Sequence, residues 1–137
     1  MADLQRPDVL LAPLPPAPRQ ALLDLYARQP QPGDDGSLHP IDATTRVTLE
    51  EGLELLEQLA VTRADAVLEI GLGYGFSTQF LLAGLQQRGG GRLVAIDPFQ
   101  SLDWQGIGRR LAQATVAAAG ADQLAFTCME ERSDWAL

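Results

Sequence analysis

The sequence contains one cysteine, Cys128, and one histidine, His39. A single thiol excludes a disulfide within the chain and leaves too few thiolates for a structural zinc site, so a reducing, cytoplasmic setting is expected. Basic residues are also scarce, because 10 arginines and lysines face 18 acidic residues and give a net charge of -8. Nucleic acid is therefore not an expected partner, since its binding depends largely on cationic side chains that displace counterions.

Long apolar runs are missing as well. No stretch approaches the roughly 18 to 20 apolar residues that a membrane span requires, so no membrane partner is expected. Hydrophobic residues make up 46% of the chain and charged residues 20%, as in ordinary globular proteins. A chain of 137 residues fits one folded domain, and we expect a compact unit of the α/β class.

Residues 1–40 are predicted to form a proline-rich lead-in with one short helix. Five prolines fall within residues 7–18, and because proline fixes φ and lacks an amide donor, this segment is expected to be extended and outside the core. The apolar pattern of residues 19–29 predicts the short amphipathic helix, and a loop is expected over residues 34–44. The remainder, residues 41–137, is expected to form the main α/β unit.

From Leu49 onward, the hydrophobic pattern alternates between helical and strand periodicity. Thr48 and Glu51 have the spacing of a capping box, which predicts a helix over 49–61. A short buried strand is predicted at 66–70. Helices and further short apolar strands are predicted to follow in alternation at 77–87, 92–97, 107–119 and 123–129. This order favours parallel pairing of the strands, as in an α/β fold.

A glycine-rich segment, VLEIGLGYGFST at residues 67–78, joins the first strand to the next helix. Its glycines alternate from Gly71 to Gly75, where backbone amides can approach an anionic or ribose-bearing ligand without obstruction by a Cβ atom. Glu69 precedes the glycines by two residues, and Asp97 ends the next strand. An acid about 20 residues beyond such a loop lies where a ribose-binding carboxylate belongs.

The same residues disfavour two other nucleotide-binding loops. In the dinucleotide fingerprint, the third glycine falls three residues after the second, and that position is Phe76 here. A P-loop continues into Gly-Lys-Ser/Thr, and no lysine lies near Ser77 and Thr78. An NAD-dependent oxidoreductase and an ATPase are thus less favoured, while a plain strand-to-helix turn without a ligand stays open.

The combined pattern resembles the class I S-adenosylmethionine-dependent methyltransferases, whose fold is a doubly wound, Rossmann-like parallel sheet. TLEEG at residues 48–52, the glycine segment, AIDPFQ at residues 95–100 and WQG at residues 104–106 are similar to a bacterial branch associated with O-methylation of small molecules or sugars. The resemblance covers about residues 41–137. It implies S-adenosylmethionine as the cofactor and a small molecule as the methyl acceptor.

The resemblance also implies a set of cofactor-binding residues, which are Glu69, Gly71, Gly73, Gly75, Ser77, Asp97, Pro98, Phe99 and Ser133. Gly71 and Gly73 would contact the methionine part of the cofactor, and Glu69 would lie near its ammonium group. Asp97 would accept hydrogen bonds from the ribose hydroxyls through two acceptor oxygens. A strand-end cap is the alternative for Asp97, and a structural hydrogen-bonding role is the alternative for Glu69.

The remaining positions of this set concern the adenine and the cofactor carboxylate. Pro98 and Phe99 would flank the adenine, and Ser133 fits a small polar position near it. Arg132 stands where the family commonly has an aspartate. The hydroxyl of Ser77 would meet the cofactor carboxylate or, alternatively, would only cap the following helix.

The family sheet has seven strands, so three predicted strands imply an incomplete fold. We expect the chain to represent the amino-terminal, cofactor-binding half of a methyltransferase, from a truncated reading frame or an incomplete sequence. An open edge at the first strand would favour self-association, and a noncatalytic interaction module is therefore an alternative function. No catalytic residue is assigned: His39 is expected to be a solvated loop residue without an acidic partner, and Cys128 a small buried side chain.

Overall fold

The computed structural model describes residues 6–136. Its central element is a parallel three-stranded sheet in the order β3-β4-β5. The strands are β3 (Ala66–Ile70), β4 (Gly91–Ile96) and β5 (Leu124–Met129). Because both pairs are parallel, the carboxyl ends of all three strands lie along one edge of the sheet. The predicted fold, an incomplete Rossmann-like α/β sheet with flanking helices, is confirmed.

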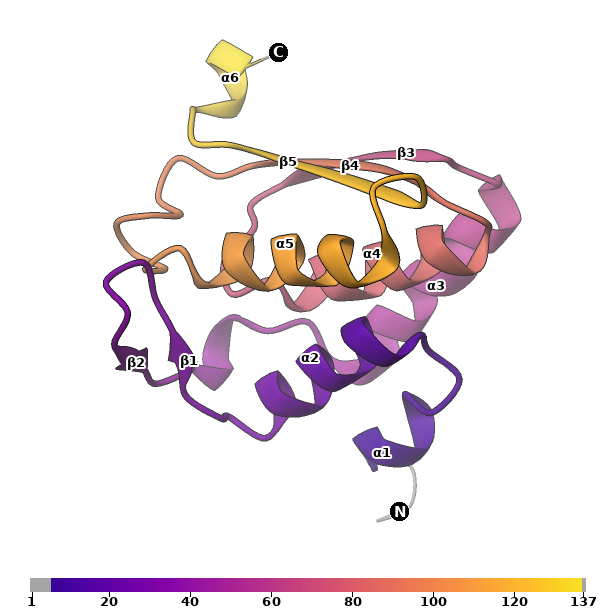
Figure 1. Cartoon of the computed structure of the whole chain (residues 1–137), viewed down its shortest axis with the longest axis horizontal. Helices are drawn as coiled ribbons and strands as arrows, with labels where there is room; N and C mark the ends of the chain where they lie inside the picture. Colours follow the sequence, from indigo (N-terminus) through magenta and orange to yellow (C-terminus); the bar gives the residue numbers. More distant parts are fainter. Residues whose placement is uncertain (1–5, 137) are drawn as a thin grey trace.

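Helices cover one face of the sheet in two layers. The longer helices are α2 (Pro16–Tyr26), α3 (Leu49–Thr62), α4 (Phe76–Gln87) and α5 (Ile107–Ala119). Figure 1 shows α3, α4 and α5 beneath the sheet, with α2 and the short α1 (Pro7–Leu10) beneath them. The main core lies between the sheet and the first layer, where Leu82, Leu85 and Leu93 are fully buried.

The prediction that residues 7–18 are extended and lie outside the core is wrong. Leu11 and Leu14 are buried and pack with Leu22 of α2 against Phe80 of α4. The prolines do not prevent helix formation, because they occur at helix starts, where the missing amide donor would have no partner within the helix. As a result, α2 begins at Pro16 rather than at residue 19.

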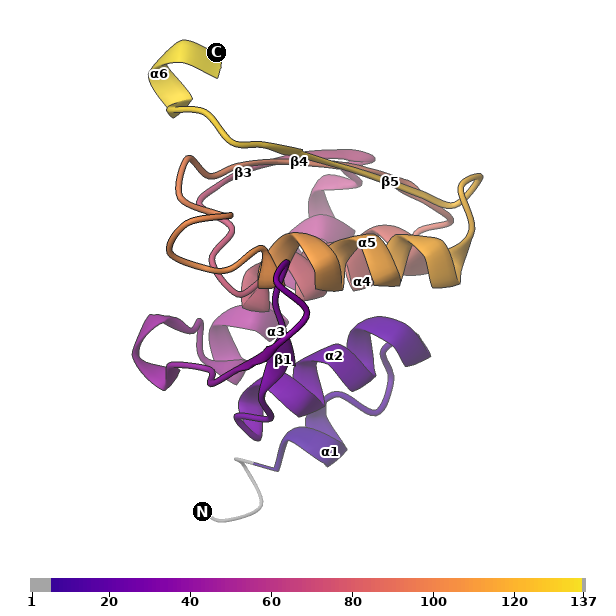
Figure 2. The ribbon, with the colours of Figure 1, turned by 60° about the vertical axis from the view of Figure 1, so that its left-hand side comes forward.

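The segment between α2 and α3 contains more structure than the predicted loop. An antiparallel hairpin pairs β1 (Gln31–Pro32) with β2 (Leu38–His39), and a short 3-10 helix, η2 (Ala43–Thr45), follows. Figure 2 shows the tip of this hairpin beside the start of α5. The amide of Asp34 at the tip donates to the carbonyl of Gln105, which fixes the hairpin to the loop before α5.

The start of α3 has the predicted capping box. Thr48 Oγ1 accepts from the Glu51 amide at 3.1 Å, and the Glu51 carboxylate accepts from the Thr48 amide at 3.1 Å. These bonds satisfy two amides that have no partner within the helix. The helix ends after Thr62, one residue later than predicted, with Arg63 in the left-handed conformation.

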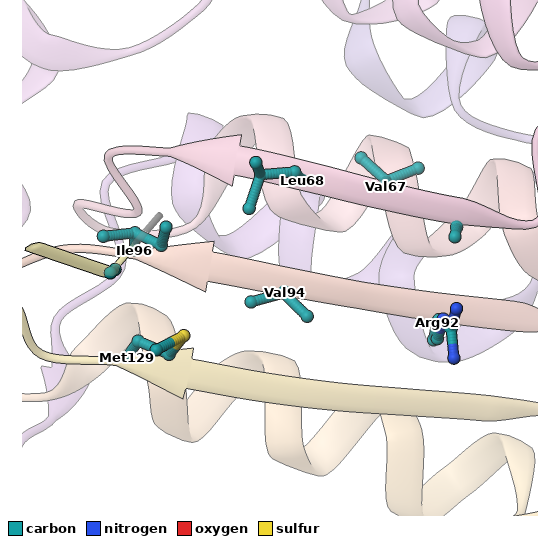
Figure 3. A pocket seen from close by; sticks show the side chains of 8 residues that line it. Val67, Leu68, Arg92, Val94, Ile96 and Met129 are labelled. Atoms are coloured by element: carbon teal, nitrogen blue, oxygen red, sulfur yellow. The ribbon is translucent and has the colours of Figure 1, made fainter. Parts of the chain in front are cut away.

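The second face of the sheet is largely uncovered, so the prediction of a buried first strand is wrong. Leu68 and Ile70 of β3 are 50% and 57% exposed. An apolar hollow of about 280 Å³ lies on this face. Figure 3 shows Leu68, Val94 and Met129 among the side chains that line it. Within the described residues only α6 (Ser133–Ala136), through Ala136, borders this hollow from outside the sheet.

Across residues 6–136, no helix combines the length and the apolar character needed to cross a lipid bilayer. The longest helix, α3, has 14 residues and carries acidic side chains in its first turn.

Candidate functional site

The glycine segment turns between β3 and α4 through left-handed backbone conformations. Gly71, Gly73 and Gly75 have φ values of 87°, 57° and 90°, which side chains larger than hydrogen disfavour. The Gly71 amide donates to the carbonyl of Ile96 at 2.8 Å, so the segment leaves the sheet beside the end of β4. The glycines are thus required by the path of the backbone itself.

The space around these glycines differs from one to the next. A Cβ atom at Gly71 would meet no atom within 4 Å, whereas one at Gly73 would lie 3.8 Å from the Trp104 ring. One at Gly75 would lie 3.3 Å from Cα of Gly108, and a Cβ at Gly108 would overlap the carbonyl of Gly73. The segment is therefore open at Gly71 and pressed against the start of α5 at its other end.

Asp97 is the hub of hydrogen bonding at this turn. Its Oδ2 accepts from the amides of Leu72 at 3.2 Å and Gly73 at 3.0 Å and from the side chain of Gln100 at 3.2 Å. Its Oδ1 accepts from the Phe99 amide at 3.0 Å. A carboxylate offers about four acceptor positions, so Oδ1, with a single donor, is the oxygen with capacity for another hydroxyl. A structural role in closing the turn is plain, and the ribose role stays a prediction.

Glu69 is buried at the end of β3 and faces the first turn of α4. Its carboxylate accepts from the hydroxyls of Ser77 at 2.6 Å and Thr78 at 2.5 Å. Burial raises the pKa of Glu69, these two hydrogen bonds oppose the rise, and the charge of Asp97 adds to it. Both oxygens therefore have partners within the protein, as in the structural alternative stated for this residue.

The sequence predicts Ser77 to be either a ligand of the cofactor carboxylate or a helix cap. The residue at the cap position of α4 is Gly75, which has no side chain to donate or accept. The Ser77 hydroxyl instead donates to Glu69. A serine hydroxyl has one proton to donate, so in this arrangement that proton is already used. Its contact with a cofactor remains a prediction.

A cavity of about 530 Å³ lies at the carboxyl ends of β3 and β4. Its lining consists of the predicted residues Gly71, Asp97, Pro98, Phe99 and Ser133 together with Ile70, Ile96, Arg132 and Asp134. The other predicted residues do not line this cavity, and they are Glu69, Gly73, Gly75 and Ser77. The structure thus gathers the glycine segment, the strand-end acid and the start of α6 around one hollow.

Two of the charged residues that line this cavity form an ion pair. Arg132 binds the carboxylate of Asp134 at 2.7 Å, and its guanidinium carbon lies 5.1 Å from the centre of the Trp135 ring. Phe99 is 52% exposed and presents an apolar surface at the same hollow. A flat, mostly apolar group with polar edges would suit these neighbours.

Gln100 is a site residue that the sequence did not indicate. Its side chain is fully buried and donates to the carbonyl of Gly73 at 2.9 Å as well as to Asp97. Its own oxygen accepts from the Arg109 amide at 3.0 Å. The available signal was only its place three residues after Asp97, since a glutamine in a polar loop is ordinarily exposed.

The prediction that His39 has no acidic partner is wrong. Its Nε2 lies 2.9 Å from Oδ1 of Asp35 and 3.2 Å from the hydroxyl of Ser37, all within the hairpin. Hydrogen bonds lower the pKa of Asp35 to about 2, and the bond with His39 contributes more than those with Ser37. The turn at Gly36 brings these side chains together, which the spacing in the sequence did not reveal.

Cys128 lies half-buried in β5, and burial raises the pKa of its thiol to about 11. A thiol that stays protonated is a poor nucleophile, in agreement with the expected packing role. Within residues 6–136 no cluster of histidine, cysteine and acidic side chains suits a metal ion.

An ion-pair network joins three segments on one side of the site. Arg109, at the start of α5, pairs with Asp34 of the hairpin tip and with Glu130 after β5. Ser101 donates to Glu130 at 2.7 Å and accepts from Arg109 at 3.0 Å. Glu130 therefore serves this network, and the network fixes the hairpin beside the loops that follow the strands.

Comparison with known proteins bears directly on this site. A family model described as "Methyltransferase domain" matches residues 68–136, which is half of the chain and includes the glycine segment from Leu68 and the cavity. Among curated proteins, the comparison found no match.

Solved structures of similar fold are about twice as long as this chain. Cofactor-bound Rv0187 from MTB is 26% identical, with a TM-score of 0.53, over 93% of this chain and 48% of its own. A putative O-methyltransferase from Klebsiella pneumoniae is 19% identical, with a TM-score of 0.51, over 89% of this chain and 47% of its own. This chain therefore spans about half the length of these structures. On the family match, the chain belongs to the methyltransferase-domain family.

Proposed function

We propose that this chain forms the S-adenosylmethionine-binding half of a methyltransferase that methylates an oxygen of a small molecule or sugar. The observation that carries the proposal is the cavity of about 530 Å³ at the carboxyl ends of β3 and β4, lined by Gly71 and Asp97. In open α/β sheets, ligands bind at this end of the strands, and small-molecule sites commonly measure about 300 to 1,000 Å³.

The residues present fit such a cofactor in shape and in chemistry. The free space above Gly71 allows a ligand to approach the backbone closely. Oδ1 of Asp97 has capacity for a ribose hydroxyl, and Phe99 offers an apolar face for an adenine. Pro98 and Ser133 border the same hollow. When bound, S-adenosylmethionine would supply an electrophilic methyl group on its sulfonium sulfur.

Support for oxygen as the methyl acceptor comes from a solved structure rather than from the cavity. One of the solved structures of similar fold is described as a putative O-methyltransferase. The chemical character of the cavity does not select an acceptor, and the acceptor site of the whole enzyme would draw on residues beyond those described. We therefore assign the donor-binding role to this chain and the choice of acceptor to the complete protein.

Calorimetric titration of the purified chain with S-adenosylhomocysteine and with NAD tests the proposal. We expect heat of binding with the first ligand and none with the second, because Phe76 occupies the position of the third dinucleotide glycine and is buried in the core. A folded chain that binds NAD but not S-adenosylhomocysteine would overturn the assignment.

Gly71→Ala with Gly89→Ala as its control sharpens this test. Both glycines have positive φ, at 87° and 97°, and a Cβ at either would meet no atom within 4 Å. The cost to folding should therefore be similar, at about 1 kcal/mol. Only the alanine at position 71 would occupy the cavity, so we expect it alone to weaken S-adenosylhomocysteine binding, by about tenfold.

A noncatalytic interaction module is the second candidate, and one observation favours it. Leu68 and Ile70 present an exposed apolar surface on the open face of the sheet. A folded chain that associates with itself or with another protein through this face, and that binds no S-adenosylhomocysteine, would favour this candidate over donor binding.

A further inference from the structure

Gln100 connects parts of the candidate site that are far apart in the sequence. It lies in the loop after β4, its side chain is fully buried, and both of its amide protons are used. One bond reaches the Gly73 carbonyl at 2.9 Å and the other reaches Asp97 Oδ2 at 3.2 Å. Its oxygen receives the Arg109 amide from the first turn of α5 at 3.0 Å. A single carboxamide thus links the glycine segment, the strand-end acid and the next helix.

The backbone of Gln100 holds the same loop closed. Its carbonyl accepts from the Gly106 amide at 2.8 Å, next to the start of α5. A backbone hydrogen bond therefore also fixes the position from which the side chain of Gln100 extends. A buried amide that has satisfied partners on every side rigidifies its surroundings.

The bonding pattern at Asp97 gives Gln100 a consequence for ligand binding. Gln100 and the amides of Leu72 and Gly73 all donate to Oδ2, and only the Phe99 amide donates to Oδ1. The carboxylate is thereby held in one orientation, with Oδ1 as the oxygen that has spare acceptor capacity beside the cavity.

We propose that Gln100 is a positioning residue for the ligand site, orienting Asp97 and the glycine segment through its carboxamide. This inference rests on the proposed donor-binding function. Glutamine suits the position because it donates to two acceptors and accepts from one amide at once. Leucine would leave the Gly73 carbonyl and the Arg109 amide without partners, and glutamate would oppose the charge of Asp97.

The chain offers a matched control in Gln79, another fully buried glutamine. Gln79 lies in α4 and accepts a hydrogen bond from Thr115 of α5 at 2.7 Å. It touches neither Asp97 nor the glycine segment through the side-chain hydrogen bonds found in residues 6–136. Loss of either glutamine removes a buried amide from the protein, but only loss of Gln100 should disturb the site.

Amide hydrogen exchange and calorimetry on the full chain test the inference. In Gln100→Leu, we expect amide exchange at Gly73 and Arg109 to quicken by about tenfold. The Arg109 amide loses its acceptor, and the Gly73 amide keeps Asp97 as its acceptor but that carboxylate loses its hydrogen bond from Gln100. Affinity for S-adenosylhomocysteine should fall by about tenfold as well. Gln79→Leu should leave the exchange of both amides and the affinity unchanged.

A pH profile separates orientation from simple packing. Gln100→Glu retains the volume of the side chain but places a second carboxyl beside Asp97, while the Arg109 guanidinium is engaged by Asp34 and Glu130. Protonated, the new carboxyl donates one hydrogen bond. Ionised, it repels Asp97 and the Gly73 carbonyl. We expect the affinity of this variant to fall relative to wild type by about tenfold from about pH 5 to about pH 8.

Each measurement can contradict a different part of the proposal. Unchanged exchange at Gly73 and Arg109 in Gln100→Leu would overturn the inference about Gln100, whatever the ligand does. A loosened loop with unchanged affinity would overturn its role in ligand binding. A wild-type chain that binds no S-adenosylhomocysteine would overturn the proposed function, while exchange would still report on Gln100. If Gln100→Leu does not fold, Gln100→Glu at about pH 5 and about pH 8 decides between these outcomes.

Discussion

At the scale of the residue, the candidate site depends on two buried carboxylates with different partners. Asp97 binds mainly backbone amides of the glycine segment and of its own loop, whereas Glu69 binds the hydroxyls of Ser77 and Thr78. Backbone amides cannot rotate away from a lost acceptor, but hydroxyls can reorient. Removing the charge from Asp97 and from Glu69 should therefore change the stability of the protein in different ways.

Asp97→Asn should lower the free energy of unfolding by about 2 kcal/mol. Whichever way its amide is oriented, one set of donors that faced a carboxylate oxygen will face an NH₂ group, and a buried donor without an acceptor costs about 1 to 3 kcal/mol. Urea unfolding measures the change, and Asp103→Asn on the exposed loop is the control. An Asp97→Asn protein as stable as wild type would contradict the hydrogen bonding described.

Glu69→Gln should change how stability depends on pH. Because burial raises the pKa of Glu69 above its ordinary 4.5, the folded state holds the proton more tightly than the unfolded state. The contribution of Glu69 to wild-type stability therefore declines as the pH rises from about 4.5 through the folded pKa. Glutamine does not titrate, so the free energy of unfolding of the variant should increase relative to that of wild type as the pH rises through this range. Above the folded pKa the difference between the two proteins should stay constant. Urea unfolding of both proteins across this pH range checks the prediction, and a margin independent of pH would refute it.

At the scale of the element, the close approach of α3 and α4 is set by small residues at their contact. A Cβ at Gly52 of α3 would overlap the ring of Phe80, and one at Gly84 of α4 would lie 2.6 Å from a methyl of Leu59. Phe80 is fully buried against α2 as well. A shift of its ring would therefore disturb the packing against α2.

Gly52→Ala should destabilise the protein although alanine favours helices. The change from glycine to alanine ordinarily gains about 1 kcal/mol in a helix, but overpacking a buried ring costs about 1 to 3 kcal/mol. We expect a net loss of about 1 kcal/mol, seen as a lower Tm in thermal unfolding followed by circular dichroism. Glu57→Ala on the exposed side of the same helix should not lower the Tm. A higher Tm for Gly52→Ala would mean that the two helices can separate at little cost.

Elements with local signals were predicted well from the sequence. The capping box predicted the start of α3, and the predicted bounds of α5 match those observed. The prediction for residues 7–18 was wrong because it relied on the number of prolines, whereas the effect of a proline depends on its position in a helix. Burial of β3 was also misjudged, since it depends on what covers the second face of the sheet rather than on the strand itself.

The part of the candidate site that has local sequence signals was predictable, and the part that depends on contacts between loops was not. The glycine segment and Asp97 follow from their positions after two parallel strands. Gln100 and the pairing of His39 with Asp35 depend on how loops turn and meet, and no periodicity in the sequence encodes those contacts.

At the scale of the whole molecule, charge and exposed apolar surface oppose each other. Leu68 and Ile70 on the open sheet face favour association, whereas a net charge of -8 keeps copies apart. Charge repulsion is screened by salt, with a Debye length of about 10 Å at 0.1 M. Self-association through the edge or face of β3 stays a prediction that ionic strength can test.

Leu68→Thr combined with Ile70→Thr should reduce self-association while keeping side chains that suit a strand. We expect wild-type chains to associate more as salt increases and the double variant to remain monomeric under the same conditions, as followed by sedimentation velocity. Val61→Thr, at an exposed position near the end of α3, should behave like wild type. Equal association of the wild type and the double variant would locate the interface elsewhere.

The packing of the amino-terminal helices against α4 also has a consequence for how the chain folds during synthesis. Leu11, Leu14 and Leu22 leave the ribosome early, but Phe80 and Ala83, the residues that bury them, are made much later. Contacts between such distant parts of a chain form slowly because a long loop must close first. The amino-terminal leucines are therefore stabilised only after α4 has been made, and until α4 emerges they are a surface that a chaperone or a protease would meet.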